Sequence, residues 1–218
     1  MTGGVTGGVV VPAYFHPAVA AGAWRALAAA GDAVRAVVFN VDSGPGAAPE
    51  RELLAVAARL RVPVLGYVDA GYGARPAADV VADLARHRAW YPVTGVFLDR
   101  VPAGPAHLSH CAALAAAARR HGLPQVVFNH GVHPHHGYAA LADALVTFEG
   151  PATAHRDVAA PRWVRDHPAA MFWHLVHDCP PDEAAAVRTR AAAHHAGMVY
   201  ATDRRGVNPW DGLPSWPL

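Results

Sequence analysis

The sequence predicts an α/β protein with a (β/α)8 TIM barrel, and three observations lead to this prediction. Short apolar segments of strand-forming residues begin near residues 8, 36, 64, 95, 125, 144, 170 and 198. Most intervals between them, which range from 19 to 31 residues, contain apolar residues at helical spacing. Each apolar segment ends in polar residues. One strand with its crossover helix needs about 30 residues, so eight such units fill residues 1–218 as one domain.

The first half of the chain follows this pattern closely. The first strand is expected at 8–12, and Pro17 is suited to the first turn of the helix that follows it. Strands at 34–39 and 62–67 are each followed by a segment with helical periodicity. The fourth strand, 95–99, is an uninterrupted apolar run that ends in aspartate, which is typical of a parallel sheet buried on both faces.

The second half is less regular. A helix is expected at 107–121, and another at 180–196. The interval of 19 residues after the fifth strand predicts a short fifth helix, and the proline-rich tail at 208–214 predicts a truncated final helix. The remaining strands are expected at 125–128, 144–148, 169–175 and 198–201.

The alternative architecture is an open doubly wound sheet, which usually binds nucleotides. Such a sheet carries a glycine-rich phosphate loop directly after its first strand. Here Gly3-Gly4 and Gly7-Gly8 precede the strand, and no Walker sequence occurs. The sequence therefore favours the barrel, and we expect no cofactor.

Composition limits the class of partner. The net charge is +1, all 18 basic residues are arginine, and 53% of residues are hydrophobic. This balance disfavours nucleic acid as a partner, and no apolar run is long enough to span a membrane. Residues 1–4 lack the features of a signal peptide, so we expect a cytoplasmic protein, or a secreted one if a leader has been removed. The oligomeric state is left open.

Two acids at strand ends are the candidate catalytic residues. Asp99 ends the fourth strand and Glu149 ends the sixth, and all strand ends of a barrel face one crevice. Glycosidases need two carboxyl groups, one protonated and one ionised. The alternatives are that Asp99 pairs with Arg100 or caps a helix, and that Glu149 is a solvated loop acid. The pair predicts a carbohydrate site, with acid and nucleophile unassigned.

Further polar residues end the other strands and are expected to bind the substrate. Aromatic side chains near these ends, Tyr67, Tyr72 and Trp173, are suited to stacking on sugar rings. The predicted substrate-binding residues are Tyr14, Asn40, Tyr67, Asp69, Arg100, Asn129, His174 and Asp203.

The 15 histidines raise the hypothesis of a metal-dependent hydrolase. His130, His133, His135 and His136 cluster in one loop, and a second group is His174-x-x-His177-Asp178. Neither group matches H-E-x-x-H or a standard zinc spacing. We therefore predict no metal site.

Motifs spread along most of the chain resemble those of spherulation-specific family 4 proteins. They are Val11-Pro12-x-Tyr14, Asn40-x-x-Ser43-Gly44-Pro45-Gly46, Gly66-Tyr67-Val68 with Tyr72-Gly73-x-Arg75, Trp90-Tyr91-Pro92-Val93-x-Gly95-Val96-Phe97-x-Asp99, Phe148-Glu149-Gly150, His177-Asp178, and Thr202-Asp203 with Asn208-Pro209-Trp210-Asp211-x-Leu213-Pro214. The resemblance implies a (β/α)8 barrel related to glycoside hydrolases. Fungal members are secreted or membrane-anchored hydrolases that cleave galactosamine-containing exopolysaccharide. It therefore implies an endo-galactosaminidase-type activity on a polysaccharide or oligosaccharide.

The chain departs from this family at Arg100. Family members commonly have Asp-Glu at the end of the fourth strand and a further Glu after the sixth, so Asp99 and Glu149 match the first and last acids. Arg100 stands where the second acid would be. A guanidinium cannot donate a proton, and we expect it to lower the pKa of Asp99 and to favour anionic or acetylated sugars. The alternative function is a non-catalytic carbohydrate-binding barrel.

Overall fold

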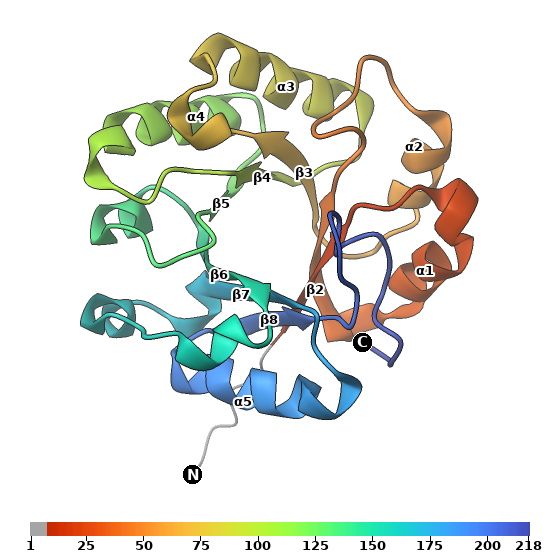
Figure 1. The fold of residues 1–218 in the computed structure, drawn as a ribbon. Coiled ribbons are helices and arrows are strands. Elements are labelled where there is room, and N and C mark those ends of the chain that lie inside the picture. The colour runs from red at the N-terminus through yellow and green to blue at the C-terminus, as the bar shows by residue number, and fades with distance from the viewer. Residues whose placement is uncertain (1–7) are drawn as a thin grey trace.

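The computed structural model describes residues 8–218 as a ring of eight parallel strands. The strands pair in sequence order from β1 to β8. Gly8 bridges Met198 of β8, which brings the two ends of the sheet together. Figure 1 shows the strands around a common axis, and the predicted (β/α)8 barrel is confirmed. Residues 1–4, in which we looked for a leader, lie outside the described residues.

Each strand begins within three residues of its predicted start. Most positions along the strands are buried, because one face fills the barrel interior and the other packs on the surrounding layer. The strands are β1 Val9–Ala13, β2 Val34–Phe39, β3 Val64–Asp69, β4 Gly95–Asp99, β5 Gln125–Asn129, β6 Ala144–Pro151, β7 Phe172–His177 and β8 Met198–Ala201.

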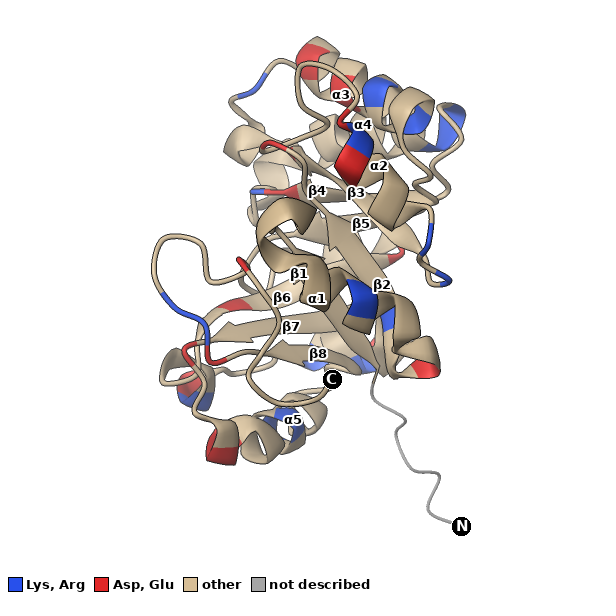
Figure 2. Cartoon of the chain, turned by 90° about the vertical axis from the view of Figure 1, so that its right-hand side faces the viewer, with Lys and Arg blue, Asp and Glu red and all other residues tan. Residues whose placement is uncertain are grey.

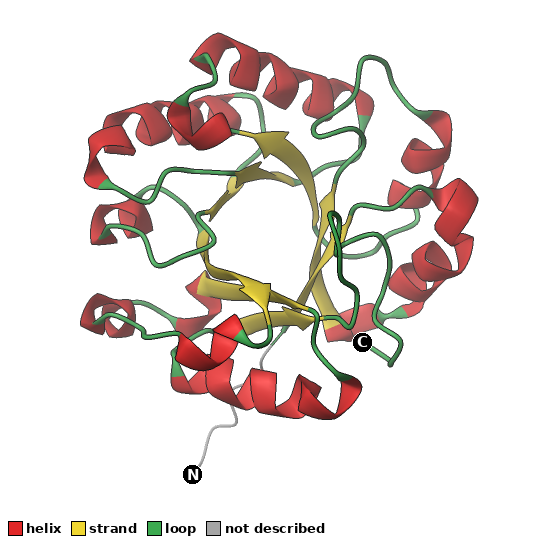
Figure 3. Ribbon diagram, in the orientation of Figure 1, coloured by secondary structure: helices red, strands yellow, loops and turns green. Residues whose placement is uncertain are grey.

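Helices cover the outside of this ring unevenly (Figure 3). The predicted short fifth helix is a single 3₁₀ segment, His136–Ala140. Three more 3₁₀ segments connect β6 to β7, where we expect a full helix in a regular barrel. No helix follows β8 in the described residues 202–218. The α-helices are α1 Pro17–Ala29, α2 Arg51–Ala57, α3 Ala77–Trp90, α4 Leu108–Arg120 and α5 Ala184–Ala193.

The outer surface carries charges of both signs. In the view of Figure 2, acidic and basic residues are interspersed along the helices and loops, in keeping with the net charge of +1. None of the helices in residues 8–218 combines the length and the apolar character that crossing a bilayer requires.

Gly95 provides a test of the strand packing. A Cβ atom added there would lie 2.4 Å from the carbonyl oxygen of Gln125 on the neighbouring strand, and backbone cannot easily move away. We expect Gly95→Ala to lower the free energy of unfolding by about 1–3 kcal/mol in urea denaturation. Gly104→Ala is the matched control, because a Cβ there meets nothing within 4 Å and its φ is −80°. Equal stability of the two variants would contradict this packing.

Candidate active site

Two pockets open at the carboxyl ends of the strands, and Glu149 lines both. The larger has a volume of about 550 Å³ and the smaller about 360 Å³. Because Glu149 lies at their junction, a chain-like ligand could occupy both sides of its carboxyl group. The larger pocket is lined mainly by Tyr14, Asn40, Ser43, Tyr67, Asn208 and Trp210, and the smaller by Tyr72, Asp99, Arg100, Asn129, His130 and His177.

Asn129 links the two candidate catalytic acids. Its side-chain nitrogen donates to Asp99 Oδ1 at 2.6 Å and also to Glu149 Oε2. Its own oxygen accepts the Gly131 backbone N–H at 3.0 Å, which fixes the orientation of the amide. Two hydrogen bonds of ordinary length from one nitrogen keep their acceptors within about 6 Å of each other. Asp99 and Glu149 therefore face a common space.

The strands that carry these two acids, β4 and β6, direct their side chains toward the pockets. Val96, Phe97 and Leu98 of β4 are fully buried, so Asp99 is the first residue of this strand to reach solvent. In β6 the register with β7 shifts between Val146 and Phe148. Such a bulge bends a strand and changes the direction of the side chains that follow it, here that of Glu149.

Burial and hydrogen bonding set the protonation of the pair. Burial, together with the nearby charge of Asp99, raises the pKa of Glu149 to about 7, against the opposing hydrogen bonds from Asn129 and Trp210. Burial also raises the pKa of Asp99, but Tyr67, Asn129 and the Arg100 backbone donate to it and oppose that rise. The Tyr67 hydroxyl lies 2.7 Å from Asp99 Oδ2. This arrangement favours protonation of Glu149 below about pH 7, while the hydrogen bonds donated to Asp99 favour the ionised form of that acid.

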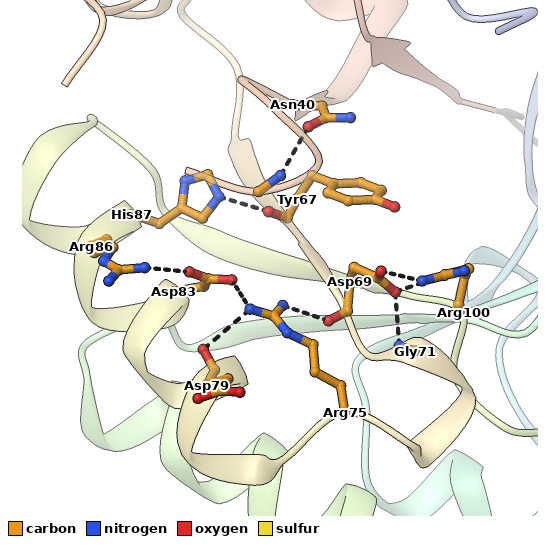
Figure 4. A network of polar contacts seen from close by, with 11 residues as sticks. Asn40, Tyr67, Asp69, Gly71, Arg75, Asp79, Asp83, Arg86, His87 and Arg100 are labelled. Atoms are coloured by element: carbon orange, nitrogen blue, oxygen red, sulfur yellow. Dashed lines mark hydrogen bonds and ion pairs between the residues drawn. The ribbon is translucent and has the colours of Figure 1, made fainter. Parts of the chain in front are cut away.

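Arg100 does not act on Asp99 in the way the sequence suggested. Its guanidinium forms a two-point ion pair with Asp69, with Nε 2.8 Å from Oδ1 and a second bond to Oδ2 (Figure 4). Arg100 opposes the rise in the pKa of Asp99 through its backbone N–H rather than through the guanidinium charge that the sequence suggested, and the net shift of that pKa is upward because burial dominates. The pKa of Asp69 is lowered instead: burial raises it, but hydrogen bonds from Arg100 and Gly71 outweigh burial.

The Asp69–Arg100 pair is held by a wider network on α3. Arg75 donates to the Asp69 backbone oxygen at 2.8 Å and to Asp83 at 2.5 Å, and Arg86 contacts the same Asp83 at 3.0 Å (Figure 4). This chain of contacts ties the end of β3 to α3. The ion pair at the rim of the smaller pocket is therefore stabilised by a second ion pair, Arg75–Asp83, through the backbone of Asp69.

The predicted substrate-binding residues divide into three groups. Tyr14, Asn40 and Tyr67 line the larger pocket, and Arg100 and Asn129 line the smaller one. Asp69 lines neither pocket but forms an ion pair with Arg100, which lines the smaller one. Two others, His174 and Asp203, are not brought to the site.

His174 points away from the pocket because it lies in the middle of β7. It is fully buried and packs against Phe148, and its Nδ1 lies 2.9 Å from Nε2 of His155. The residue that ends β7 is His177, which lines the smaller pocket. Asp203 accepts the backbone N–H of Ser215 at 3.0 Å and so stabilises the tail instead.

The loop histidines make different contacts, and His135 packs on His136 with ring centroids 4.2 Å apart. Nδ1 of His130 lies 3.1 Å from the backbone oxygens of Val101 and Pro102, and His135 accepts the Gly137 N–H. In the part of the chain that the structure describes, no three His, Cys, Asp or Glu side chains are arranged to hold a metal ion.

Sequence reasoning missed the tail as part of the site. Trp210 donates its indole N–H to Glu149 Oε1 at 3.2 Å, and Asn208 lines the same pocket. The available signal was the motif Asn208-Pro209-Trp210-Asp211, which contributed to the family resemblance but was not assigned a role.

Comparisons with known proteins agree with this fold. The sequence profile described as spherulation-specific family 4 matches residues 8–216. Spherulin-4 of Physarum polycephalum is 27% identical over 212 residues, and the match covers 89% of this chain but 63% of that protein.

Solved structures show the same architecture. Sph3 of Aspergillus clavatus, crystallised in complex with GalNAc, superposes with a TM-score of 0.82 at 24% identity, over 97% of this chain and 94% of that one. Dihydrodipicolinate synthase of Agrobacterium tumefaciens gives a TM-score of 0.52 at 15% identity, over 90% and 70% of the two chains. These likenesses concern the fold. The profile match over nearly the whole chain establishes that this protein belongs to spherulation-specific family 4.

Proposed function

We propose that this protein is a glycoside hydrolase that cleaves within an amino-sugar polysaccharide, using Asp99 and Glu149 as its carboxyl pair. The observation that carries the proposal is the geometry of these two acids. One amide nitrogen, on Asn129, donates to both, at the junction of two pockets. A pocket on each side of Glu149 suits a sugar chain bound on both sides of the cleaved linkage.

The different surroundings of the two acids support separate roles. Glu149, with its pKa raised to about 7, is the general acid that protonates the leaving oxygen. Asp99, with its oxygens held by Tyr67 and Asn129, is the nucleophile that attacks the anomeric carbon as the glycosidic bond breaks. Glu149 then takes a proton from water, and this water displaces Asp99 from the sugar.

The spacing of the acids favours retention of configuration. Retaining glycosidases have carboxyl groups about 5–5.5 Å apart, whereas inverting enzymes leave about 6.5–9.5 Å for a water molecule. The shared Asn129 nitrogen keeps the nearest oxygens of Asp99 and Glu149 within about 6 Å. This separation leaves little room for the water that inversion requires.

The substrate class is proposed from family membership and from the pocket. The related Sph3 structure contains GalNAc, which supports an N-acetylated amino sugar as the unit bound here. Hydroxyl and amide groups of Tyr14, Asn40 and Asn208 line the larger pocket and could bond sugar hydroxyls. Arg100, already paired with Asp69, presents less free positive charge than an unpaired arginine would.

Activity is expected to fall as the pH rises through about 7. Glu149 must be protonated to act as the acid, and its pKa is raised to about 7, so its working form is present below that pH. On the acid side, activity is lost as Asp99 becomes protonated. The profile of kcat/KM against pH on a GalNAc-containing polysaccharide checks this. Constant activity from pH 6 to 9 would contradict the role of Glu149.

The second candidate function is a carbohydrate-binding barrel without catalysis. Arg100 favours it, because this residue occupies the place of a family acid and is engaged by Asp69. A panel of polysaccharides, assayed for released reducing ends and for binding, separates the two functions. Binding without release across galactosamine-containing polymers would support the second.

A further inference from the structure

The tail that follows β8 takes the place of the eighth helix of a regular barrel. Residues 202–218 contain no helix, yet several hydrogen bonds hold them in place. Arg204 donates to the Leu213 backbone oxygen at 3.2 Å, Ser215 donates its N–H to Asp203 at 3.0 Å, and Tyr200 donates to the Gly212 oxygen at 3.4 Å. These contacts give the segment 203–216, which we term the C-terminal arm, a defined path.

Asn208 joins the C-terminal arm to the other side of the larger pocket. Its Nδ2 donates to the Tyr14 backbone oxygen at 3.1 Å, and its Oδ1 accepts the Trp210 N–H at 3.0 Å. The Tyr14 N–H in turn donates to the Trp210 oxygen at 3.2 Å. Tyr14 follows β1, so the first and last segments of the barrel are joined here and together form one pocket wall.

Trp210 extends from this junction to Glu149. Its side chain is 4% exposed and packs against His177 and Tyr200, with ring centroids 5.8 Å and 5.9 Å away. Its indole N–H, which can only donate, lies 3.2 Å from Glu149 Oε1. The other carboxyl oxygen, Oε2, accepts from Asn129. Glu149 is therefore held at both oxygens, once by the barrel and once by the arm.

We propose that the C-terminal arm is a working part of the active site, in which Trp210 is a positioning residue for Glu149 and Asn208 holds the arm in register. The proposal deepens the proposed hydrolase function and rests on it for its effect on turnover. It adds that the last segment of the chain sets both the orientation and the protonation of the general acid. The absence of a final helix in residues 202–218 leaves the space that the arm occupies.

The direction of the expected change in the pKa of Glu149 follows from the hydrogen bond that Trp210 donates to it. A hydrogen bond to a carboxylate favours its ionised form, so removing the indole N–H raises the pKa of Glu149 further above its ordinary value. Trp210→Phe removes the donor and keeps an aromatic ring. We expect the pKa of Glu149 to rise by about one unit, the size that one hydrogen bond to a charged group supports.

Carboxyl-carbon NMR on protein labelled with ¹³C-glutamate measures this without any substrate. The sequence contains only four glutamates, Glu50, Glu52, Glu149 and Glu183, so Glu149 can be assigned by its loss in Glu149→Gln. The matched control is Trp24→Phe. Trp24 is 3% exposed and its indole N–H donates at 3.2 Å to the Phe15 oxygen. The Trp24→Phe substitution should leave the titration of Glu149 unchanged.

Asn208→Ala provides a second variant in case the loss of the indole disturbs folding. It frees the arm while keeping Trp210, and we expect a rise in the pKa of Glu149 in the same direction but smaller. On the polysaccharide, Trp210→Phe should shift the alkaline limb of kcat upward and lower kcat at least 10-fold, with a smaller change in KM. These shifts, absent in Trp24→Phe, support the proposal.

An unchanged titration of Glu149 in both Trp210→Phe and Asn208→Ala would overturn the role of the arm. This result is independent of catalysis. If no polysaccharide is cleaved, the proposed hydrolase function fails, while the NMR titration still decides whether the arm controls Glu149.

Discussion

Asp99→Asn is expected to lower kcat/KM on a GalNAc-containing polysaccharide by about 10⁴-fold or more, because an amide oxygen is a poor nucleophile. Asparagine is nearly the same size, and the Tyr67 hydroxyl can still donate to its oxygen at the position it now occupies, 2.7 Å away. The fold should therefore survive. Steady-state kinetics on the polymer, with thermal unfolding as the check on folding, measures the effect.

An aryl glycoside of a GalNAc oligomer extends this test. Its leaving group needs no protonation, so it bypasses the general acid but still needs the nucleophile. Asp99→Asn should lose activity on both substrates. Asp32→Asn is the control, since Asp32 is exposed in the turn before β2 and lines neither pocket. Similar losses in the two variants would mean that Asp99 has no special role.

Glu149→Gln should lower kcat/KM on the polysaccharide by about 10²–10⁴-fold, the usual contribution of a general acid. On the aryl glycoside, formation of the covalent intermediate should proceed at nearly the wild-type rate, because that step no longer needs a proton. A burst of released phenol followed by slow turnover is the expected signature in rapid-mixing experiments.

Glu183→Gln serves as the control for this variant. Glu183 pairs with Arg156 at the surface and lines neither pocket, so its change should leave the rate unaltered. If Glu149→Gln lost activity equally on both substrates without a burst, the assignment of acid and nucleophile would have to be reversed or abandoned.

The two candidate acids could be located from sequence because strand burial is a local pattern. The residues before Asp99 form an apolar run, and an acid directly after such a run lies where the strands of a barrel open. The same reasoning located Tyr14, Asn40, Tyr67 and Asn129, which all line the two pockets. A local sequence pattern is therefore enough to place a residue at the pockets when that residue ends its own strand.

His174 shows where this reasoning fails. Side chains alternate along a strand, so a strand end placed two residues too early leaves the assigned face unchanged but puts a residue deeper in the sheet than expected. The sequence indicated a seventh strand that ends at residue 175, but β7 continues to His177. His174 therefore packs on Phe148 rather than in the pocket. His177, three residues further along, ends β7 and lines the smaller pocket.

Trp210 could not be assigned from local sequence at all. It lies 61 positions beyond Glu149, and the two meet only because the sheet closes on itself. The irregular β6–β7 connection is easier to rationalise: Pro161 and Pro168 each remove an N–H, which prevents a long helix there. Prediction was thus limited by contacts between distant segments rather than by strand patterns.

The most direct test of the carboxyl pair is the release of reducing ends from a GalNAc-containing polysaccharide by wild type, Asp99→Asn and Glu149→Gln in parallel. The account predicts release by the wild-type protein and its near-complete loss in both variants, with all three still folded. Release at the wild-type rate by either variant would contradict the account.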